Sequence, residues 1–590
     1  LVVREYISPS GLVIQGTPMA LLQATLLPEV RASLEVPLAM LVSEPILDAW
    51  VEDSSGTTIH GTEVRIEGWR DDVLSSVPDS WLLADDFGKE LRGDVGDAAK
   101  TWLDDARQYD TGRWEGQLSG TDLAEILGEP ALGWLRPIPT IGVDNDRSRD
   151  HMEINTFQSV NPYFTSPLDG SGEIVAVADT GIDHDHGDFG SRIDAKVDLV
   201  GDGSTADTDS GHGTHVACTI VGDGARGGYK GVASGANLYF QAMEQDSTGN
   251  MFSASINYLI STAYDNGART HSNSWGSQDV SVNGQYTSDS EDVDDRANYY
   301  DRYYNGRQGM TIIFAAGNDG PDPGSIGPPS TAKNSLTVGM HQSRYSGSPD
   351  TVMSGSGRGP TDDGRIKPDI LAPGGYIRSC RAQEAQDTSG SSWTQQWYLE
   401  YTGTSMATPN AAGAAVLVRE YLTEIALRPS PQGALVKALL VLGAEDIGSR
   451  NIPNNNEGWG RINLKNSLAP SGSRGIWVDD RSVMSNSGSM KTYTFEVEQG
   501  SLSFKAVLTW SDERGSRFSS SQLVNDLDLE VEAPDGTIYL GNVFASGHSQ
   551  VGGTRDTVNN LEVVLVDVAS VGTWTVRVKD SGHGGSRSQP

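Results

Sequence analysis

The middle of the chain alternates two kinds of hydrophobic segment, and this alternation limits the folds that are open to it. Short runs that are apolar throughout, EIVAVAD, TIIFAAG and SLTVGM, are separated by segments of helical periodicity, SASINYLISTAYDNG and GALVKALLVLGAEDI. A strand without polar alternation is buried on both faces, and the intervening helices supply the covering layers. Residues 150–470 are therefore predicted to form an α/β domain whose parallel sheet has helices on both faces.

The regions on either side have different patterns. Residues 1–149 mix strand-like runs, VPLAMLV and TEVRIEGW, with helix-like runs, DAAKTWLDDARQY and GTDLAEILG, and are predicted to be an α+β region. Its last stretch, GVDNDRSRDH, is expected to be an exposed linker and a site of proteolytic cleavage near Arg149. Residues 471–590 alternate apolar and polar side chains between turns, as in KTYTFEVEQ, LDLEVEAPDGTIYLG and GTWTVRVKD, which predicts an antiparallel β-sandwich.

The charge of the chain excludes two classes of partner. With 79 acidic and 43 basic residues, the formal net charge is −36. Such a field repels nucleic acid phosphates and anionic lipid surfaces. We interpret the acidic side chains as a solubilising surface, with adaptation to salty water or a reservoir for calcium as alternatives. No run approaches the ~18 apolar residues of a membrane span. The chain begins at Leu1 without an apolar leader, so any signal peptide is expected to have been removed or left out of this sequence.

The chain has only two cysteines, Cys218 and Cys380. They could form one disulfide or remain two small buried apolar side chains, and the sequence leaves both possibilities open. Neither lies in a CxxC pair, so a zinc site is not expected.

Three segments of the predicted α/β domain carry residues that can act together in catalysis. IVAVADTGIDHDHGDF places Asp179 at the end of a buried strand, SGHGTHVACTIVG begins a helix at His212, and YTGTSMATPNAAGAAVLV begins one at Ser405. A serine hydroxyl becomes a strong nucleophile when an imidazole removes its proton, and a carboxylate orients that imidazole. A helix that begins at the nucleophile adds backbone N–H groups beside the developing oxyanion. We therefore predict nucleophilic catalysis by Ser405, His212 and Asp179.

These segments resemble the signature motifs of the subtilase family of serine proteases. DTGID followed by HGDF, HGTHVA and GTSMATP occur in the order Asp, His, Ser that subtilisin has. Two more segments are similar to family motifs: TIIFAAGNDGP to the oxyanion-hole motif and THSNSWGS to the substrate-binding strand. The resemblance implies that the Asn318 side chain and the Ser405 N–H bind the oxyanion. It also implies two walls of a substrate cleft, formed by Ser274, Trp275 and Gly276 and by Ala315, Ala316 and Gly317.

The resemblance covers residues 150–590, because the tail is similar to that of the large oxidation-tolerant alkaline proteases of bacilli, in which strings like WSD, VNDLDL and APDGT recur. It implies a subtilisin-like fold and a secreted endopeptidase that hydrolyses extended polypeptides through an acyl-enzyme. It also implies a zymogen that processes itself. By position, residues 1–149 are expected to be a propeptide that binds the catalytic domain. No organic cofactor is implied.

Members of this family commonly contain structural calcium, and the tail has turns rich in oxygen ligands. The candidate ligands are Asp512, Asp526, Asp528, Asn542 and Asp556. The alternative is an acidic edge that is simply solvated.

Each motif also has a purely structural interpretation. Asp179 could cap a turn, Ser405 could be an ordinary helix N-cap, and Asn318 lies in an Asn-Asp-Gly turn signal. His212 and His215 could suggest a metal pair, but helical ligands are usually spaced i, i+4, so His215 is assigned to packing.

Two other classes of function are alternatives to a serine protease. The chain could be a non-catalytic scaffold that keeps a subtilase fold, but all four catalytic groups are present. A lipase or esterase of the α/β-hydrolase type is not supported, because the serine motif is not GxSxG. The loop after the catalytic aspartate also holds a possible metal cluster, which we interpret as a variable surface loop: Asp183, Asp185, His186 and Asp188.

Overall fold

The computed structural model describes six short strands of the N-terminal region and most of the chain beyond it. The described residues are 2–7, 11–15, 63–68, 107–110, 113–117, 132–137, 144–158, 167–251, 254–302, 308–343, 348–386, 388–469, 475–480, 484, 487–498 and 502–584. The chain divides into two compact units, residues 1–141 and 142–590.

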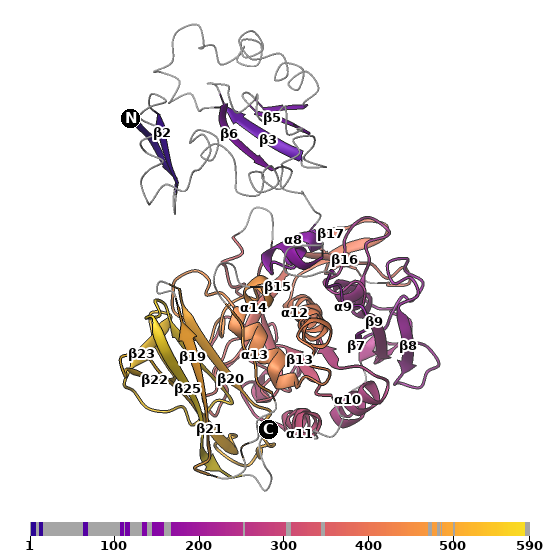
Figure 1. The fold of residues 1–590 in the computed structure, drawn as a ribbon. Helices are drawn as coiled ribbons and strands as arrows, with labels where there is room; N and C mark the ends of the chain where they lie inside the picture. The colour runs from indigo at the N-terminus through magenta and orange to yellow at the C-terminus, as the bar shows by residue number, and fades with distance from the viewer. Residues whose placement is uncertain are drawn as a thin grey trace. The chain divides into compact units, whose positions relative to one another are not determined.

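The described strands of the N-terminal unit form two antiparallel sheets. One pairs β1 (Val2–Ile7) with β2 (Gly11–Gln15), and the other has the order β4 (Arg107–Asp110), β5 (Arg113–Gln117), β3 (Glu63–Gly68), β6 (Leu132–Pro137) (Figure 1). β3 confirms the strand predicted at TEVRIEGW. β4 covers the end of DAAKTWLDDARQY, so the helix predicted there is wrong at residues 107–109. The predicted strand VPLAMLV and helix GTDLAEILG lie outside the described residues.

The second unit is built on a seven-stranded parallel sheet, as the apolar runs predict. Its order is β15 (Ile370–Gly375), β14 (Leu336–Gln342), β13 (Thr311–Ala315), β12 (Thr270–Asn273), β7 (Ile174–Asp179), β9 (Asn237–Ala242), β8 (Ile193–Asp198). After β7 the chain forms β8 and β9 on one side of this strand, and then β12 and the later strands on the other side. The strand order therefore reverses at β7, and the carboxyl end of a strand at such a point is where α/β sheets bind ligands.

Helices cover both faces of this sheet (Figure 1). α9 (His212–Val221), α12 (Thr404–Glu420) and α13 (Gly433–Gly443) share a core with Val175 and Val177 of β7. α10 (Ile256–Asp265) and α11 (Ser288–Arg302) share another with Ala176 of the same strand. Successive side chains of a strand point to opposite faces, so an uninterrupted apolar run fills both cores. No described helix is long and apolar enough to cross a membrane.

Smaller elements complete this domain. β16 (Ile377–Cys380), β18 (Tyr398–Tyr401) and β17 (Trp393–Thr394) form an antiparallel sheet, and β10 (Glu244–Gln245) pairs with β11 (Asn250–Met251). α14 (Leu464–Leu468) packs on α13. Cys218 of α9 and Cys380 of β16 form a disulfide, with Cα atoms 5.7 Å apart. Of the two possibilities that the sequence leaves open, the structure has the disulfide.

The polar stretch that was predicted to be an exposed linker is folded instead. α8 (Asp144–His151) spans most of it, and Ser148 is completely buried. Arg149 is only 8% exposed, and its guanidinium donates hydrogen bonds to Asn155 and to the Lys230 carbonyl. The prediction of an exposed cleavage site near Arg149 is therefore wrong for the folded chain. The predicted division at residue 149 lies inside this helix, whereas the compact units separate at residue 141.

The C-terminal region has the antiparallel architecture that its alternating pattern predicts. A five-stranded sheet has the order β19 (Met490–Val497), β25 (Gly572–His583), β21 (Asn525–Glu532), β22 (Ile538–Ala545), β23 (His548–Val551), and β20 (Phe504–Thr509) pairs with β24 (Leu561–Val566). Leu529, Val564 and Trp574 form part of the apolar core between the two sheets. Lys333 of the α/β domain reaches Asp512 of the β-sandwich at 2.7 Å, with both side chains buried.

Candidate active site

Two of the three predicted catalytic residues are hydrogen-bonded at the carboxyl end of the central sheet. Asp179 is the last residue of β7 and is completely buried, and His212 is the first residue of α9. His212 Nδ1 lies 2.6 Å from Asp179 Oδ1. Gly211 precedes the helix with φ 74°, a left-handed conformation that favours glycine and lets the chain turn directly into His212. Since Nδ1–H is donated to the carboxylate, Nε2 of the neutral ring is left to accept a proton.

A second carboxylate, Asp207, supports this pair, and sequence reasoning missed it. Its Oδ1 accepts from the Thr180 hydroxyl at 2.9 Å, and its Oδ2 accepts from the Thr214 N–H at 2.7 Å. Thr180 in turn donates its backbone N–H to Asp179 Oδ1 at 2.8 Å. Asp207 is completely buried, and burial raises its pKa to about 7. The segment STADTDS, just upstream of His212, contains it, but nothing in the sequence indicates that Thr180 joins the two carboxylates.

The charges around His212 favour its protonated form. Burial acts to lower the pKa of the imidazole, but the Asp179 charge, its hydrogen bond and the more distant Asp207 outweigh burial, so the pKa is raised. An imidazolium formed when His212 takes a proton would therefore be stabilised in place. This is the electrostatic requirement for a general base that must hold a proton during the reaction.

Ser405 lies in the first turn of α12, which begins at Thr404 after the extended Gly403. Its hydroxyl donates to the Ser274 carbonyl at 2.9 Å, and the Ser274 hydroxyl donates to the Ser405 carbonyl at 2.9 Å. Among the described residues no hydrogen bond joins Ser405 to His212. The third link of the predicted triad is thus not made in this conformation, in which Ser274 holds the nucleophile.

The start of α12 holds the side-chain oxygen of Asn318, the predicted oxyanion donor. Its Oδ1 accepts from the Thr404 N–H at 2.9 Å and from the Thr404 hydroxyl at 3.0 Å. With the oxygen held by two donors, the Nδ2 amide group faces away from Thr404 and can donate elsewhere. Asn318 is exposed, whereas Thr404 is completely buried, so the buried helix start fixes the rotamer of a surface side chain.

The predicted cleft walls follow two neighbouring strands. Ser274, Trp275 and Gly276 continue β12 past its carboxyl end, and Ala316, Gly317 and Asn318 continue β13. Ser274 contacts Ser405, and Asn318 contacts Thr404, so both walls meet the start of α12. Ala315 and Ala316 are buried, and Gly317 has φ 95°.

The indole of Trp275 is anchored to the sheet. Its Nε1–H donates to the Ala178 carbonyl at 2.9 Å, and its ring lies edge-on to Phe314 at 5.4 Å. We infer that its backbone, rather than its side chain, is the part that can meet a peptide.

His215 has the packing role that was predicted for it. Its Nε2 donates to the Ile377 carbonyl at 3.0 Å, and it is completely buried. Burial lowers its pKa to about 3, so the ring stays neutral.

Four of the five predicted calcium ligands lie together in the β-sandwich. Burial, followed by the charges of Asp528, Asp556 and Asp580, raises the pKa of Asp526 to about 6. Asn542 donates to Asp556 at 2.6 Å. Glu562, which sequence reasoning missed, joins the group, and burial with the neighbouring carboxylates raises its pKa well above the usual value.

Asp512 has a different set of partners. Its carboxylate binds Lys333 at 2.7 Å and accepts from the N–H groups of Val524 and Asn525. This is the partner set of a buried ion pair between domains, so we leave Asp512 out of the candidate calcium site.

A family model and individual relatives both indicate one protein family. A family model described as "Subtilase family" matches residues 170–460. Serine protease AprX of Bacillus subtilis (strain 168) is 34% identical over 313 residues, which cover 51% of this chain and 67% of AprX. Serine protease/ABC transporter B family protein tagD of Dictyostelium discoideum is 25% identical over 552 residues, which cover 68% of this chain and 30% of tagD. The chain thus spans less than a third of the length of tagD.

Among solved structures, the crystal structure of a cold-adapted subtilisin-like serine proteinase is 25% identical and covers 53% of this chain and 97% of that one, with a TM-score of 0.37. The match to AprX, the family model and the order of Asp179, His212 and Ser405 lead to one conclusion. This chain belongs to the subtilase family.

Proposed function

We propose that this protein is a serine endopeptidase that hydrolyses peptide bonds of extended polypeptides through an acyl-enzyme. The observation that carries the proposal is the short hydrogen bond from His212 to the buried Asp179, at the edge of the sheet where α12 begins with Ser405. Asn318, tied to the same helix start, supplies a donor for the charge that develops in acyl transfer.

Substrate binding would release the nucleophile. A peptide that adds as an extended strand beside residues 274–276 brings its own N–H groups to their carbonyls. Ser405 now donates to the Ser274 carbonyl. A substrate N–H that takes this acceptor leaves the Ser405 hydroxyl to turn toward His212 Nε2, and such bonds commonly tighten only in the complex with substrate.

The chemical steps then follow from the groups in place. His212 takes the Ser405 proton as Oγ attacks the scissile carbonyl, and Asp179 stabilises the imidazolium. Asn318 Nδ2–H and the Ser405 N–H bind the tetrahedral oxyanion. His212 returns the proton to the leaving amine, and water repeats the cycle on the acyl-enzyme. Activity should therefore require the neutral form of His212.

We also propose that the protein is secreted as a zymogen and that residues 1–141 act as its propeptide. The N-terminal unit is compact by itself, and the buried Cys218–Cys380 disulfide is typical of proteins from oxidising compartments. Self-cleavage is expected near the boundary of the units, at residues 141 and 142, rather than inside the folded helix α8.

Calcium is proposed to bind the acidic group of the β-sandwich. Ca²⁺ takes about six to eight oxygen ligands, which carboxylates together with backbone carbonyls can supply. Asp526 Oδ1, Asp528 Oδ1 and Glu562 Oε1 are buried and have no hydrogen-bond partner among the described residues. We assign Asp526, Asp528 and Glu562 as ligands. The Asn542 amide is instead engaged by Asp556, the Leu561 carbonyl and the Val563 N–H, and the Asp556 oxygens accept from Asn542, Val558 and Asn559. The ion would neutralise carboxylates that otherwise repel one another.

The test compares the wild-type chain with Ser405→Ala at neutral pH, with an unfolded protein as substrate. Mass spectrometry should show substrate fragments and a new N-terminus near residue 142 only with the wild type. Fragments that appear equally with Ser405→Ala would refute the assignment. Fragments without a new N-terminus would refute self-processing and leave the peptidase proposal standing.

A further inference from the structure

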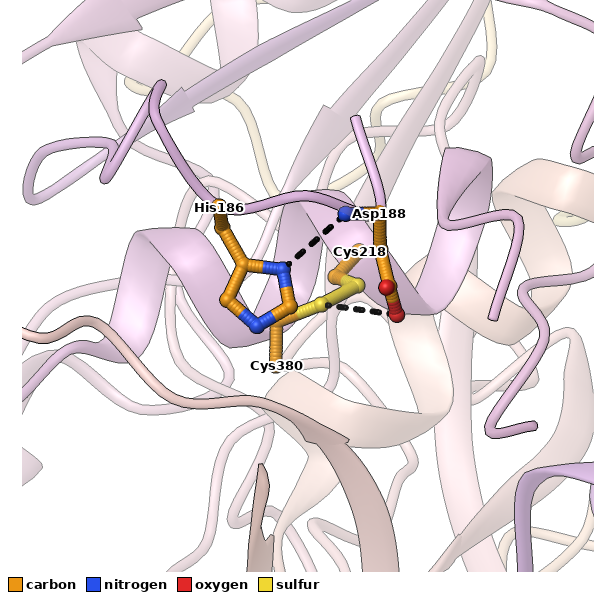
Figure 2. Close-up of side chains that lie close together, drawn as sticks. All are labelled: His186, Asp188, Cys218 and Cys380. Carbon is orange, nitrogen blue, oxygen red and sulfur yellow. Dashed lines mark hydrogen bonds between the residues drawn. A yellow bond between two sulfur atoms is a disulfide. The ribbon is translucent and has the colours of Figure 1, made fainter. Parts of the chain in front are cut away.

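The loop that follows Asp179 brings a histidine and an aspartate next to two cysteines. His186 and Asp188 lie in that loop, Cys218 lies in α9, and Cys380 ends β16. One potential ligand atom of each lies within 4.8 Å of those of the other three. All four side chains are at most 2% exposed. Figure 2 shows the imidazole and the carboxylate on either side of the two sulfur atoms.

The histidine is held in the form that a metal ligand needs. Its Nε2 lies 3.0 Å from the Trp397 carbonyl, which can only accept, so Nε2 carries the proton. Its Nδ1 accepts a long hydrogen bond of 3.3 Å from the Asp188 N–H, so Nδ1 has the lone pair. Metal-bound histidines commonly donate their other ring N–H to a backbone carbonyl in this way. Nδ1 is thus the nitrogen that could bind a cation, and it would give up the long hydrogen bond from the Asp188 N–H to do so.

The carboxylate of Asp188 is completely buried without a counter-charge. Its Oδ2 accepts from the Tyr398 hydroxyl at 2.7 Å and lies 3.7 Å from Cys380 Sγ, while Oδ1 accepts from the Arg226 N–H. Within the described part of the chain it forms no salt bridge. Burial and this carboxylate raise the pKa of Tyr398, which therefore stays a neutral donor. A buried carboxylate is costly unless a cation or a metal ion pairs with it.

We propose that these four residues bind one zinc ion when the cysteines are reduced. Two thiolates, one imidazole and one carboxylate form a four-ligand set of the kind that zinc takes in tetrahedral sites. Bonds of about 2.0–2.3 Å to zinc place such ligand atoms about 3–4 Å apart. After reduction the two sulfur atoms would therefore move apart, while the other ligand atoms, now within 4.8 Å, would move closer. The absence of a CxxC pair hides the site in the sequence, because three separate segments supply its ligands.

The disulfide and the zinc ion are alternative occupants of one site. An external dithiol breaks the S–S bond, gives two electrons and two protons to the sulfurs of Cys218 and Cys380, and becomes a disulfide itself. Zn²⁺ then replaces the two thiol protons, which are released. In a chain that folds before oxidation, zinc would bind first, and later oxidation would release it. The disulfide ties α9, which begins with His212, to β16, and the zinc ion would tie both to the loop after Asp179 as well.

The test uses the full chain with Ser405→Ala, which prevents self-digestion. The protein is prepared once with its thiols reduced and once oxidised, and each form is incubated with Zn²⁺ and freed of excess metal. Elemental analysis should find about one zinc per chain in the reduced form and almost none in the oxidised form. Co²⁺ in place of zinc should give the thiolate-to-cobalt band and the intense visible bands of a tetrahedral site.

Three variants identify the ligands. His186→Ala and Cys218→Ala/Cys380→Ala should lose the metal and the cobalt spectrum. The control is His184→Ala, which removes a neighbouring histidine whose side chain is 48% exposed, and this variant should keep both. The proposal is overturned if the reduced chain without these substitutions binds no zinc. It is also overturned if the cysteine double variant binds as much zinc as its parent, and neither result depends on whether the protein cleaves peptides.

Discussion

The contact between Thr404 and Asn318 allows a graded test of the oxyanion site. Asn318→Ala removes the amide donor, and removal of one such donor costs about 100–1000-fold in kcat, or about 2.7–4 kcal/mol, a magnitude measured on the relative subtilisin. Thr404→Val keeps the donor but removes one of the two bonds that orient it, the 3.0 Å bond from the hydroxyl. A neutral hydrogen bond contributes about 0.5–1.5 kcal/mol, so this variant should lose about 2–13-fold.

The two changes should not add. Since the Thr404 hydroxyl acts on the reaction through the Asn318 side chain, Thr404→Val should have little effect in a chain that already carries Asn318→Ala. Steady-state kinetics on a chromogenic peptide amide measures the cycle, and the loss should fall on kcat with KM nearly unchanged. Thermal midpoints of the four proteins control for misfolding.

Two results would refute this reasoning. A loss in Asn318→Ala of less than about 10-fold would mean that the amide does not bind the developing charge. An equal effect of Thr404→Val in both backgrounds would mean that the hydroxyl acts on Ser405 or on the start of α12, and not through Asn318.

Three other perturbations test the electrostatics and the domain contact. The acid limb of kcat/KM should have its midpoint above 6.5, the ordinary pKa of histidine, because the pKa of His212 is raised. Asp207→Asn removes one of the charges that raise this pKa and should move the midpoint to lower pH. A midpoint that does not move would contradict the coupling between Asp207 and His212. Calcium-free protein should lose thermal stability as pH rises from 3.8 to about 6, because the pKa of Asp526 is raised in the folded state. Added calcium should restore the lost stability. A thermal unfolding midpoint that a chelator does not change would count against the calcium site. Lys333→Met should cost about 3–5 kcal/mol of unfolding free energy, because the buried Asp512 carboxylate loses its cation and keeps only the N–H groups of Val524 and Asn525. Lys333→Met/Asp512→Leu should recover part of this loss, as denaturant titration can check.

The predictions that held depend on local patterns. The apolar run EIVAVAD requires burial on both faces, and β7 has that burial, with Asp179 at its carboxyl end. SGHGTHVACTIVG predicts a helix that begins at His212 after a glycine, and α9 begins there. YTGTSMATPNAAGAAVLV predicts a long apolar helix from Ser405, and α12 begins one residue earlier, at Thr404. In these segments propensity, periodicity and tertiary burial favour the same structure.

The predictions that failed, and the residues that were missed, depend on contacts between distant segments. Arg149 lies in a polar stretch that resembles a solvated linker, but hydrogen bonds to Asn155 and Lys230 bury it. Asp512 resembles a calcium ligand by its surroundings in sequence, and only the fold brings Lys333 to it. Asp207 acquires its role through the Thr180 hydroxyl. No local pattern encodes such pairings, because each partner lies on a different element.

The most direct test of the account is labelling of the intact active chain with a serine-directed fluorophosphonate, followed by peptide mapping. We predict a single modified residue, Ser405, and rapid labelling that is slowed strongly in His212→Ala, because the imidazole no longer takes the hydroxyl proton. Labelling that is absent from the N-terminally processed wild-type chain, or that persists in Ser405→Ala, would contradict the claim that Asp179, His212 and Ser405 form one catalytic unit.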